Sequence, residues 1–391
     1  MSESEKLDYP IVFVHGMFGW GQNEGINKIA PYWGATTGSL TDYLMKNGIE
    51  CYAASVGPMS SAWDQACELY AQLTGTRVDY GKVHSKKYGH RRFGRTYSAP
   101  LFKGWSKEKK VHLVGHSFGG NACRLLTHLL TYGSPEEKAS GGDDISPLFT
   151  GNKEELVFSV TAICTPLNGT DAYETAKKYK LISPLKYICY NFAGLIGRSP
   201  INGKFADFHL EQFGLTDTPG RKDKEPFIKT VTALFNTKDN IAYDMSDQGA
   251  DDMNKLIRIS PKVYYFSYSF NSVEKSADGK KDKARYTDFI LMKATSSLML
   301  HDGRKSGRKT VGNDGLVDVD SARYPKTEPF AEFVNGREVK AGLWNVMPTR
   351  FGDHGTPIGL FADKSETHSF YESHILLLSN IEKKSAEAAE V

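Results

Sequence analysis

The stretch that decides the fold is VGHSFGG, residues 114–120. It holds the pattern Gly-x-Ser-x-Gly around Ser117, between the strand-like run KVHLV and the helix-like segment NACRLLTHLLTYG. A strand that turns sharply into a helix exposes the serine at the top of the turn, and small residues on either side let the two elements approach. This context predicts a nucleophilic serine at Ser117, and the alternative is an incidental serine in a glycine-rich turn.

Outward from this turn, apolar runs alternate with segments of helical spacing. We expect strands in IVFVHG (11–16), KVHLVGHS (110–117), VFSVTAICTP (157–166) and KVYYFSYSF (262–270). Such alternation predicts an α/β fold with a mostly parallel central sheet and helices on both faces. The 391 residues show no internal repeat, and we expect one domain over residues 1–391.

The composition is that of an ordinary globular protein, with 40% hydrophobic and 24% charged residues and a net charge of +3. This balance does not favour nucleic acid as a partner, and we expect the basic run at residues 86–95 to be solvated surface. No apolar run reaches the ~18 residues of a transmembrane helix, so we expect no membrane anchor. The N-terminal residues show no signal peptide, which suits a cytoplasmic chain or a secreted one whose leader has been removed.

The cysteines form no pattern of paired spacing. Their number is odd, they are widely separated, and several lie in apolar runs: Cys51, Cys67, Cys123, Cys164 and Cys189. We expect buried free thiols and no disulfide framework.

A nucleophilic serine that transfers acyl groups needs two donors for the oxyanion. One is expected to be the backbone N–H of Phe118, the residue after the nucleophile. The loop after the first strand, HGMFGW (15–20), can supply the other, and we assign it to the N–H of Met17.

The base and its orienting carboxylate should follow the serine along the chain, in the order acid and then histidine. The segment VGNDGLVDVDSA (311–322) offers Asp314 in a turn, with Asp318 and Asp320 as alternatives nearer a strand. RFGDHGTP (350–357) offers His354 in a glycine-flanked loop. Its rivals His368 and His374 lie in a helical pattern, where we expect surface positions.

These residues, together with the block VGPMSSAWDQACELYAQLTGTRVDYGKVHSKKYGHRRFGRTY (56–97), ISPLF (145–149) and NDGLV (313–317), resemble the thermoalkalophilic bacterial lipases. The resemblance covers nearly the whole chain. It implies an α/β-hydrolase fold with a zinc-bearing insertion and a helical lid. It also implies a triad of Ser117, Asp314 and His354. The oxyanion positions depart from the family, where Gln and Phe usually stand in place of Phe118 and Met17.

The resemblance also implies a structural zinc ion. Matched motif by motif, its ligands are Asp64, His84, His90 and Asp244. Four nitrogen and oxygen ligands suit a closed zinc site. The ion would pin an insertion at residues 60–97 to a segment at 205–250.

The family's calcium site is not matched. Thr356 stands where the family has a glutamate, and the next aspartate, Asp363, precedes Lys364 rather than a proline. We therefore do not favour calcium as a cofactor.

The resemblance places a lid at residues 175–200, where apolar residues recur at helical spacing, although a core helix would show the same pattern. We expect a carboxylic ester hydrolase acting on hydrophobic esters such as triacylglycerols, with the substrate at a lipid–water interface. The alternatives are an esterase for shorter or polymeric esters, an acyltransferase, and a non-catalytic binding protein.

Overall fold

The computed structural model describes residues 6–140, 144–183, 205–214, 236–275, 282–285, 289–306 and 312–389. Within these residues, seven parallel strands form the central sheet. In spatial order they are β11 (Phe330–Glu332), β12 (Trp344–Val346), β7 (Tyr264–Tyr268), β6 (Val157–Ile163), β5 (Val111–His116), β1 (Ile11–Val14) and β2 (Cys51–Ala54). All four strands expected from the sequence are present, within a few residues of the predicted limits.

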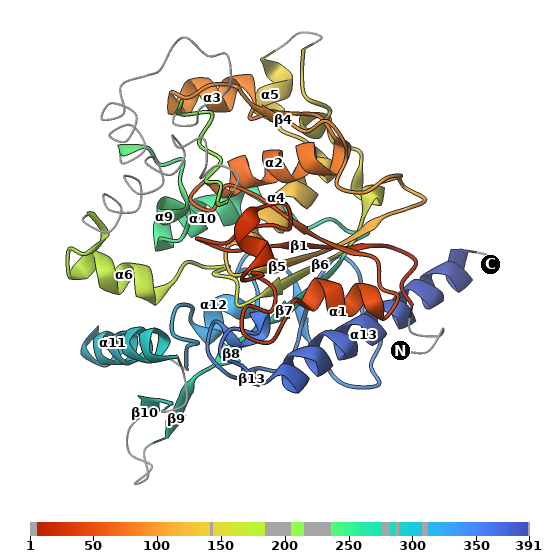
Figure 1. The fold of residues 1–391 in the computed structure, drawn as a ribbon. Coiled ribbons are helices and arrows are strands. Elements are labelled where there is room, and N and C mark those ends of the chain that lie inside the picture. Colours follow the sequence, from red (N-terminus) through yellow and green to blue (C-terminus); the bar gives the residue numbers. More distant parts are fainter. Residues whose placement is uncertain are drawn as a thin grey trace.

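Helices cover both faces of this sheet (Figure 1). On one side lie α2 (Ala62–Thr74), α4 (Gly119–Tyr132) and α10 (Asp247–Leu256), and on the other α1 (Leu40–Lys46) and α13 (Lys364–Ala389). Successive side chains of a strand point to opposite faces of the sheet, so each strand contributes to the hydrophobic core on both sides. In β1, Val12 and Val14 pack on the α4 side, while Ile11 and Phe13 pack on the α13 side. The two-sided α/β architecture predicted from the sequence is confirmed.

Shorter elements decorate this frame. The other helices are α3 (Lys82–Tyr88), α5 (Pro135–Ala139), α6 (Asp171–Lys178), α9 (Ile241–Asp244), α11 (Ile290–Ser306) and α12 (Val319–Arg323), with 3₁₀ turns η2 (Gly25–Lys28), η3 (Pro147–Thr150), η4 (Glu154–Leu156) and η6 (Thr356–Ile358). In the described part of the chain, three strand pairs lie outside the sheet: β3 (Arg77–Asp79) with β4 (Phe93–Thr96), β9 (Val273–Lys275) with β10 (Asp282–Ala284), and β8 (Phe270–Asn271) with β13 (Arg350–Phe351). No helix in the described part of the chain combines the length and apolar character needed to span a bilayer.

The segment at residues 60–97 forms α2, β3, α3 and β4, stacked above α4 in Figure 1. The described parts of residues 205–250 contact it. The backbone N–H of Arg91 donates to Gln212 (3.0 Å), and the guanidinium of Arg95 pairs with Asp207 (2.8 Å) and Glu211. In the basic run expected to be solvated, Lys86 and Lys87 are exposed, whereas Arg95 is partly buried and its charge is balanced by two carboxylates.

The lid expected at residues 175–200 lies mostly outside the described residues. Within the described part, α6 ends at Lys178. Four cysteines, Cys51, Cys67, Cys123 and Cys164, are buried free thiols as expected, and Cys189 falls outside the described residues.

Candidate functional site

Ser117 lies in the turn between β5 and α4, in a backbone conformation that side chains rarely adopt (φ +54°). The turn is tight because β5 and α4 approach closely: a Cβ on Gly115, in β5, would lie 2.4 Å from the backbone nitrogen of Gly120 in α4. The N–H of Ser117 donates to the carbonyl of Ile163 on β6 (2.8 Å), which anchors the turn to the sheet. This is the strand–turn–helix geometry that presents a serine hydroxyl outside the carboxyl end of a parallel sheet.

The loop after β1 lies directly against this serine. A Cβ on Gly16 would come within 2.6 Å of the Cβ of Ser117 and 3.1 Å of its hydroxyl oxygen. Among the described residues, the backbone N–H groups of Met17 and Phe118 donate to no acceptor. Two free N–H groups beside a strained serine are the arrangement that an oxyanion requires.

Asp314 and His354, here called the acid–base pair, are held together at two points. The imidazole Nδ1 donates to the carboxylate Oδ2 of Asp314 (2.8 Å), and the backbone N–H of His354 donates to the carbonyl of Asp314 (2.7 Å). The second carboxylate oxygen accepts the N–H groups of Leu316 (2.9 Å) and Val317 (2.7 Å). Both side chains are buried. Each carboxylate oxygen of Asp314 accepts a hydrogen bond, and the bond from Nδ1–H fixes the tautomer of His354.

His116, the residue before Ser117, lies next to His354: the centroids of their two rings are 4.8 Å apart. The nucleophile and the histidine are therefore close neighbours. Among the described residues, no hydrogen bond joins the Ser117 hydroxyl to His354. Such bonds are often long in unliganded sites and shorten when substrate is present.

The alternatives for the acid and the base have other partners. Asp318 precedes α12 and accepts the N–H of Asp171 (2.8 Å), and Asp320 is exposed. His368 stacks on Tyr43 with ring centroids 3.6 Å apart. His374, expected at the surface, is buried beneath the sheet, where it hydrogen-bonds Thr161 (2.8 Å) and Tyr268 (3.0 Å). That expectation was wrong because α13 is packed against the sheet.

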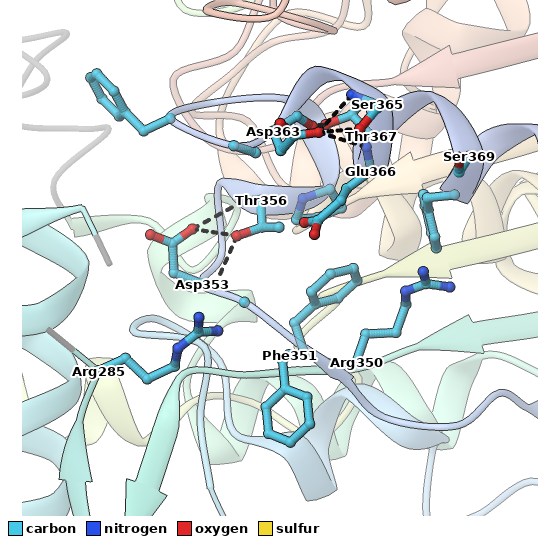
Figure 2. A pocket seen from close by; sticks show the side chains of 16 residues that line it. Arg285, Arg350, Phe351, Asp353, Thr356, Asp363, Ser365, Glu366, Thr367 and Ser369 are labelled. Atoms are coloured by element: carbon cyan, nitrogen blue, oxygen red, sulfur yellow. Dashed lines mark hydrogen bonds between the residues drawn. The ribbon is translucent and has the colours of Figure 1, made fainter. Parts of the chain in front are cut away.

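A cavity of about 630 Å³ adjoins the loop of His354 without containing the acid–base pair (Figure 2). Arg285, Arg350 and Phe351 lie along one wall. Asp353 also lines this cavity; one of its oxygens accepts the Thr356 hydroxyl and N–H (both 3.0 Å), and the other accepts the N–H of Phe289. These contacts hold the loop of His354 in place. Because neither Asp314 nor His354 lines the cavity, it borders the site and does not form it.

A second polar cluster lies in the insertion. Asp64, His84, His90 and Asp239, here called the metal-ligand cluster, bring one ligand atom each to within 4.8 Å of the others. The Nε2 of His84 lies 3.4 Å from Asp64 and 3.2 Å from Asp239, and the Nε2 of His90 lies 3.1 Å from Asp239. All four facing atoms are buried and make no hydrogen bond within the described residues.

The surroundings of the cluster prepare these atoms for a cation. The Nδ1–H of His90 donates to the Arg91 carbonyl (2.8 Å), which leaves the lone pair on Nε2 in the neutral ring. Burial alone would lower the pKa of His84, but the carboxylates of Asp239 and Asp64 raise it to about 9. A metal ion would replace the proton on this ring, so metal and proton compete for it.

The structure brings Asp239, and not the expected Asp244, next to the two histidines. Asp244 ends the short helix α9, and its carboxylate accepts the N–H of Ala62 at the start of α2 (2.8 Å). Burial raises the pKa of Asp244 to about 8. Asp239 lies five residues earlier and faces both histidines.

A Ser-bearing turn after β5, followed along the chain by an aspartate loop and a histidine loop, defines an α/β-hydrolase. The chain belongs to the family described as "Lipase-like, C-terminal domain", whose sequence profile matches residues 7–383.

Known relatives agree with this assignment. "Lipase 1" of Staphylococcus aureus is 35% identical over 92% of the chain, and the lipase of Staphylococcus epidermidis is 34% identical over 90%. The chain spans about half the length of these relatives, 51% and 50%. Among solved structures, Staphylococcus hyicus lipase superposes with a TM-score of 0.85 at 32% identity, covering 98% of this chain and 99% of that one. EstA from Clostridium botulinum gives 0.80 at 36% identity, covering 96% and 88%.

Proposed function

We propose that this chain is a serine-dependent carboxylic ester hydrolase that acts on hydrophobic esters such as acylglycerols. The observation that carries the proposal is the acid–base pair, joined at two points and placed beside a strained serine. The relatives named lipases support the same chemistry.

Each residue has one role in the proposed reaction. The Ser117 hydroxyl attacks the acyl carbon while His354 takes its proton and later gives it to the leaving alcohol. Asp314 holds the imidazole and stabilises its cation. The N–H groups of Met17 and Phe118 bind the oxyanion, and water then releases the acid.

The surface near the loop after β1 carries exposed apolar side chains that favour an apolar substrate. Phe18, next to Met17, is 41% exposed, and Ile29 in the same loop region is 78% exposed. Phe205, whose carbonyl accepts the N–H of Ile26, is 45% exposed. Exposed apolar side chains in and near the loop that follows β1 support docking of a lipid surface or a long acyl chain.

The test is the hydrolysis rate against acyl length, from acetyl to long-chain esters, with and without a lipid interface. A lipase gives its maximum at medium or long chains and gains from the interface, whereas a maximum at short soluble esters indicates an esterase. Added alcohol that appears in a new ester product indicates acyl transfer. Ser117→Ala should remove the activity and Ser373→Ala, an exposed serine on α13, should not; wild-type rates in Ser117→Ala would disprove the proposal.

We also propose that the metal-ligand cluster holds a structural zinc ion through Asp64, His84, His90 and Asp239. Two imidazoles and two carboxylates suit zinc, and four protein ligands leave no open position for chemistry. The ion would bond the insertion to the segment that carries Asp239 and stabilise both. Metal analysis of the purified protein should find about one zinc per chain, and a chain that stays metal-free in excess zinc would contradict this.

The residues at the expected calcium positions are engaged within the protein. Thr356 donates its hydroxyl to Asp353, and Asp363 accepts the N–H groups of Ser365 (2.8 Å) and Glu366 (3.0 Å) at the start of α13. We therefore propose no calcium ion.

A further inference from the structure

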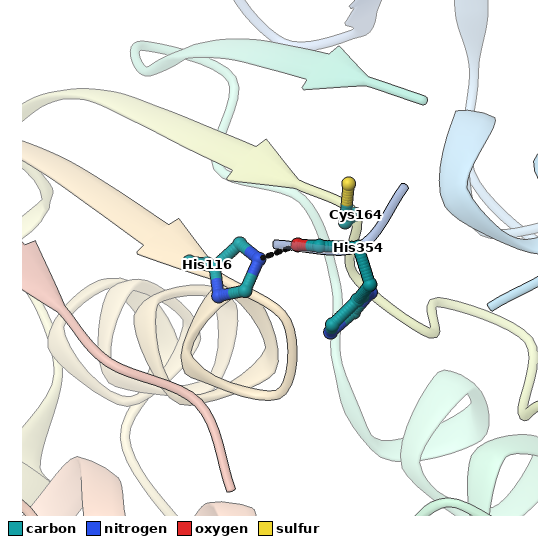
Figure 3. A group of neighbouring side chains, drawn as sticks. All are labelled: His116, Cys164 and His354. Carbon is teal, nitrogen blue, oxygen red and sulfur yellow. Dashed lines mark hydrogen bonds between the residues drawn. The ribbon is translucent and has the colours of Figure 1, made fainter. Parts of the chain in front are cut away.

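A line of buried hydrogen bonds joins three parts of the proposed machinery. The N–H of Gly16, in the loop after β1, lies 3.0 Å from the phenol oxygen of Tyr32. That oxygen lies 2.7 Å from Nδ1 of His116, the residue before the nucleophile. The Nε2 of His116 lies 2.9 Å from the backbone carbonyl oxygen of His354 (Figure 3).

The chemistry of these groups fixes the direction of every bond. A carbonyl can only accept, so Nε2 of His116 carries the hydrogen. Burial, with His354 beside it, lowers the pKa of His116 far below its usual value, so the ring is neutral and Nδ1 accepts. The Tyr32 hydroxyl must then donate to Nδ1, and its oxygen accepts the N–H of Gly16. Burial also raises the pKa of Tyr32, which keeps its proton.

We propose that Tyr32 and His116 are positioning residues that set the oxyanion loop and the catalytic histidine relative to Ser117. Neither side chain acts on the reacting atoms. One end of the line holds Gly16, which precedes the oxyanion donor Met17, and the other holds the backbone of His354. Because His116 is covalently next to Ser117, both ends of this line are held at fixed positions relative to the nucleophile. This inference rests on the proposed ester hydrolysis.

A metal ion is the competing interpretation of the same residues. Ligand atoms of His116, Cys164 and His354 lie within 4.8 Å of one another. Both ring nitrogens of His116 are already hydrogen-bonded, however, and Nδ1 of His354 donates to Asp314. In Figure 3 the sulfur of Cys164 points away from the two rings. His116 therefore has no free lone pair for a metal, and the two remaining groups are fewer than the three or four ligands of a protein metal site.

Tyr32→Phe removes the donor to His116 and the acceptor for Gly16. We expect kcat to fall about 10- to 100-fold, as displaced catalytic groups do, with KM for a soluble ester within about twofold of wild type. Tyr265→Phe is the matched control, because Tyr265 is also buried and its hydroxyl also accepts a backbone N–H, that of Ser260 (3.0 Å), away from the site. Its kcat should match wild type.

Two substitutions of His116 separate the halves of the line. His116→Gln can still donate from its amide to the His354 carbonyl, whereas His116→Leu cannot. We expect His116→Leu to lose at least about tenfold more kcat than His116→Gln. Titration of active sites with an organophosphonate should express each kcat per competent molecule, so that misfolded protein does not count.

The outcomes separate this inference from the proposed function. If Ser117→Ala retains wild-type activity, the proposed function fails and the positioning role fails with it. If Ser117→Ala is inactive while Tyr32→Phe keeps the kcat of Tyr265→Phe, only the positioning role fails. Equal kcat values for the two His116 variants would also overturn it, because a plain core histidine predicts no such difference.

Discussion

The acid–base pair and the metal-ligand cluster are both buried polar groups assembled from distant segments, yet their hydrogen bonding is opposite. In the acid–base pair, both oxygens of Asp314 have donors and its main chain is joined to that of His354. In the metal-ligand cluster, four buried atoms face one another without a hydrogen bond within the described residues. A buried polar group without a partner costs free energy. The acid–base pair therefore needs no further partner, whereas the metal-ligand cluster is suited to a cation.

The largest effect should come from breaking the acid–base pair alone. Asp314→Asn keeps the shape but favours the wrong tautomer of His354, and we expect kcat to fall about 10⁴-fold. Metal content should not change, because the cluster is built from other segments. A steady-state assay on metal-analysed protein checks both statements, and a parallel loss of zinc would show that the two regions are not independent.

The next effect should come from removing a metal ligand. Asp239→Asn should lose the ion and with it about 4 kcal/mol of stability when free zinc stands at about 1,000 times Kd. Asp244→Asn is the matched control, since its amide oxygen can still accept the N–H of Ala62 and its metal content should stay at the wild-type level.

Thermal unfolding with and without a chelator measures this difference. The wild type and Asp244→Asn should lose Tm on chelation, and Asp239→Asn should not respond. The reverse result, with zinc lost from Asp244→Asn and kept by Asp239→Asn, would restore Asp244 as the ligand.

A smaller effect is expected where the loop after β1 presses on the serine. Gly16→Ala places a Cβ 2.6 Å from that of Ser117, so the loop must shift and carry the N–H of Met17 with it. We expect about a 10²-fold fall in kcat, the usual result of losing one oxyanion donor. Gly38→Ala, where a Cβ meets nothing within 4 Å, should cost stability through its backbone conformation (φ +88°) but leave kcat unchanged. Similar kcat values for the two variants would argue against the assignment of Met17.

The smallest effect concerns Asp318, beside the acid–base pair. Burial and the Asp171 carboxylate raise its pKa to about 8, so the folded protein holds a proton that the unfolded chain has released. Its contribution to stability is therefore full below about pH 4 and is lost as pH rises toward 8. Asp318→Asn should raise Tm by roughly 2–4 °C at pH 8–9 and change it little at pH 4. Asp320→Asn, exposed on α12, should show no such pH dependence, and a flat difference for Asp318→Asn would refute the sign.

The sequence predicts the serine site better than the metal-ligand cluster for a physical reason. Ser117 is tied to a strand and a helix by local spacing, and the structure has both within two residues of their expected positions. Asp314 and His354 each lie in a glycine-containing turn between regular elements, where the sequence offers few other candidates for the acid and the base. Local pattern suffices when a residue's position follows from the element that carries it.

The choice between Asp239 and Asp244 has no such local signal. Both lie in the same short stretch, on either side of Asn240, which caps the four-residue helix α9. Which one faces His84 and His90 depends on how this segment packs on the insertion, and that contact spans more than 140 residues of chain. The burial of His374 and the ion pairing of Arg95 were missed for the same reason, because their partners lie on distant elements.

Because the main chains of His354 and Asp314 are hydrogen-bonded, loss of a catalytic side chain can be distinguished from loss of the loop geometry. Replacing either side chain removes a proton acceptor or its partner but leaves the amide-to-carbonyl link between the two loops untouched. In a His354→Ala variant the loops should therefore keep a vacant, correctly shaped space where the ring stood. An added small imidazole can enter such a space and serve as a diffusible base, so lost chemistry could be supplied from solution while lost geometry could not.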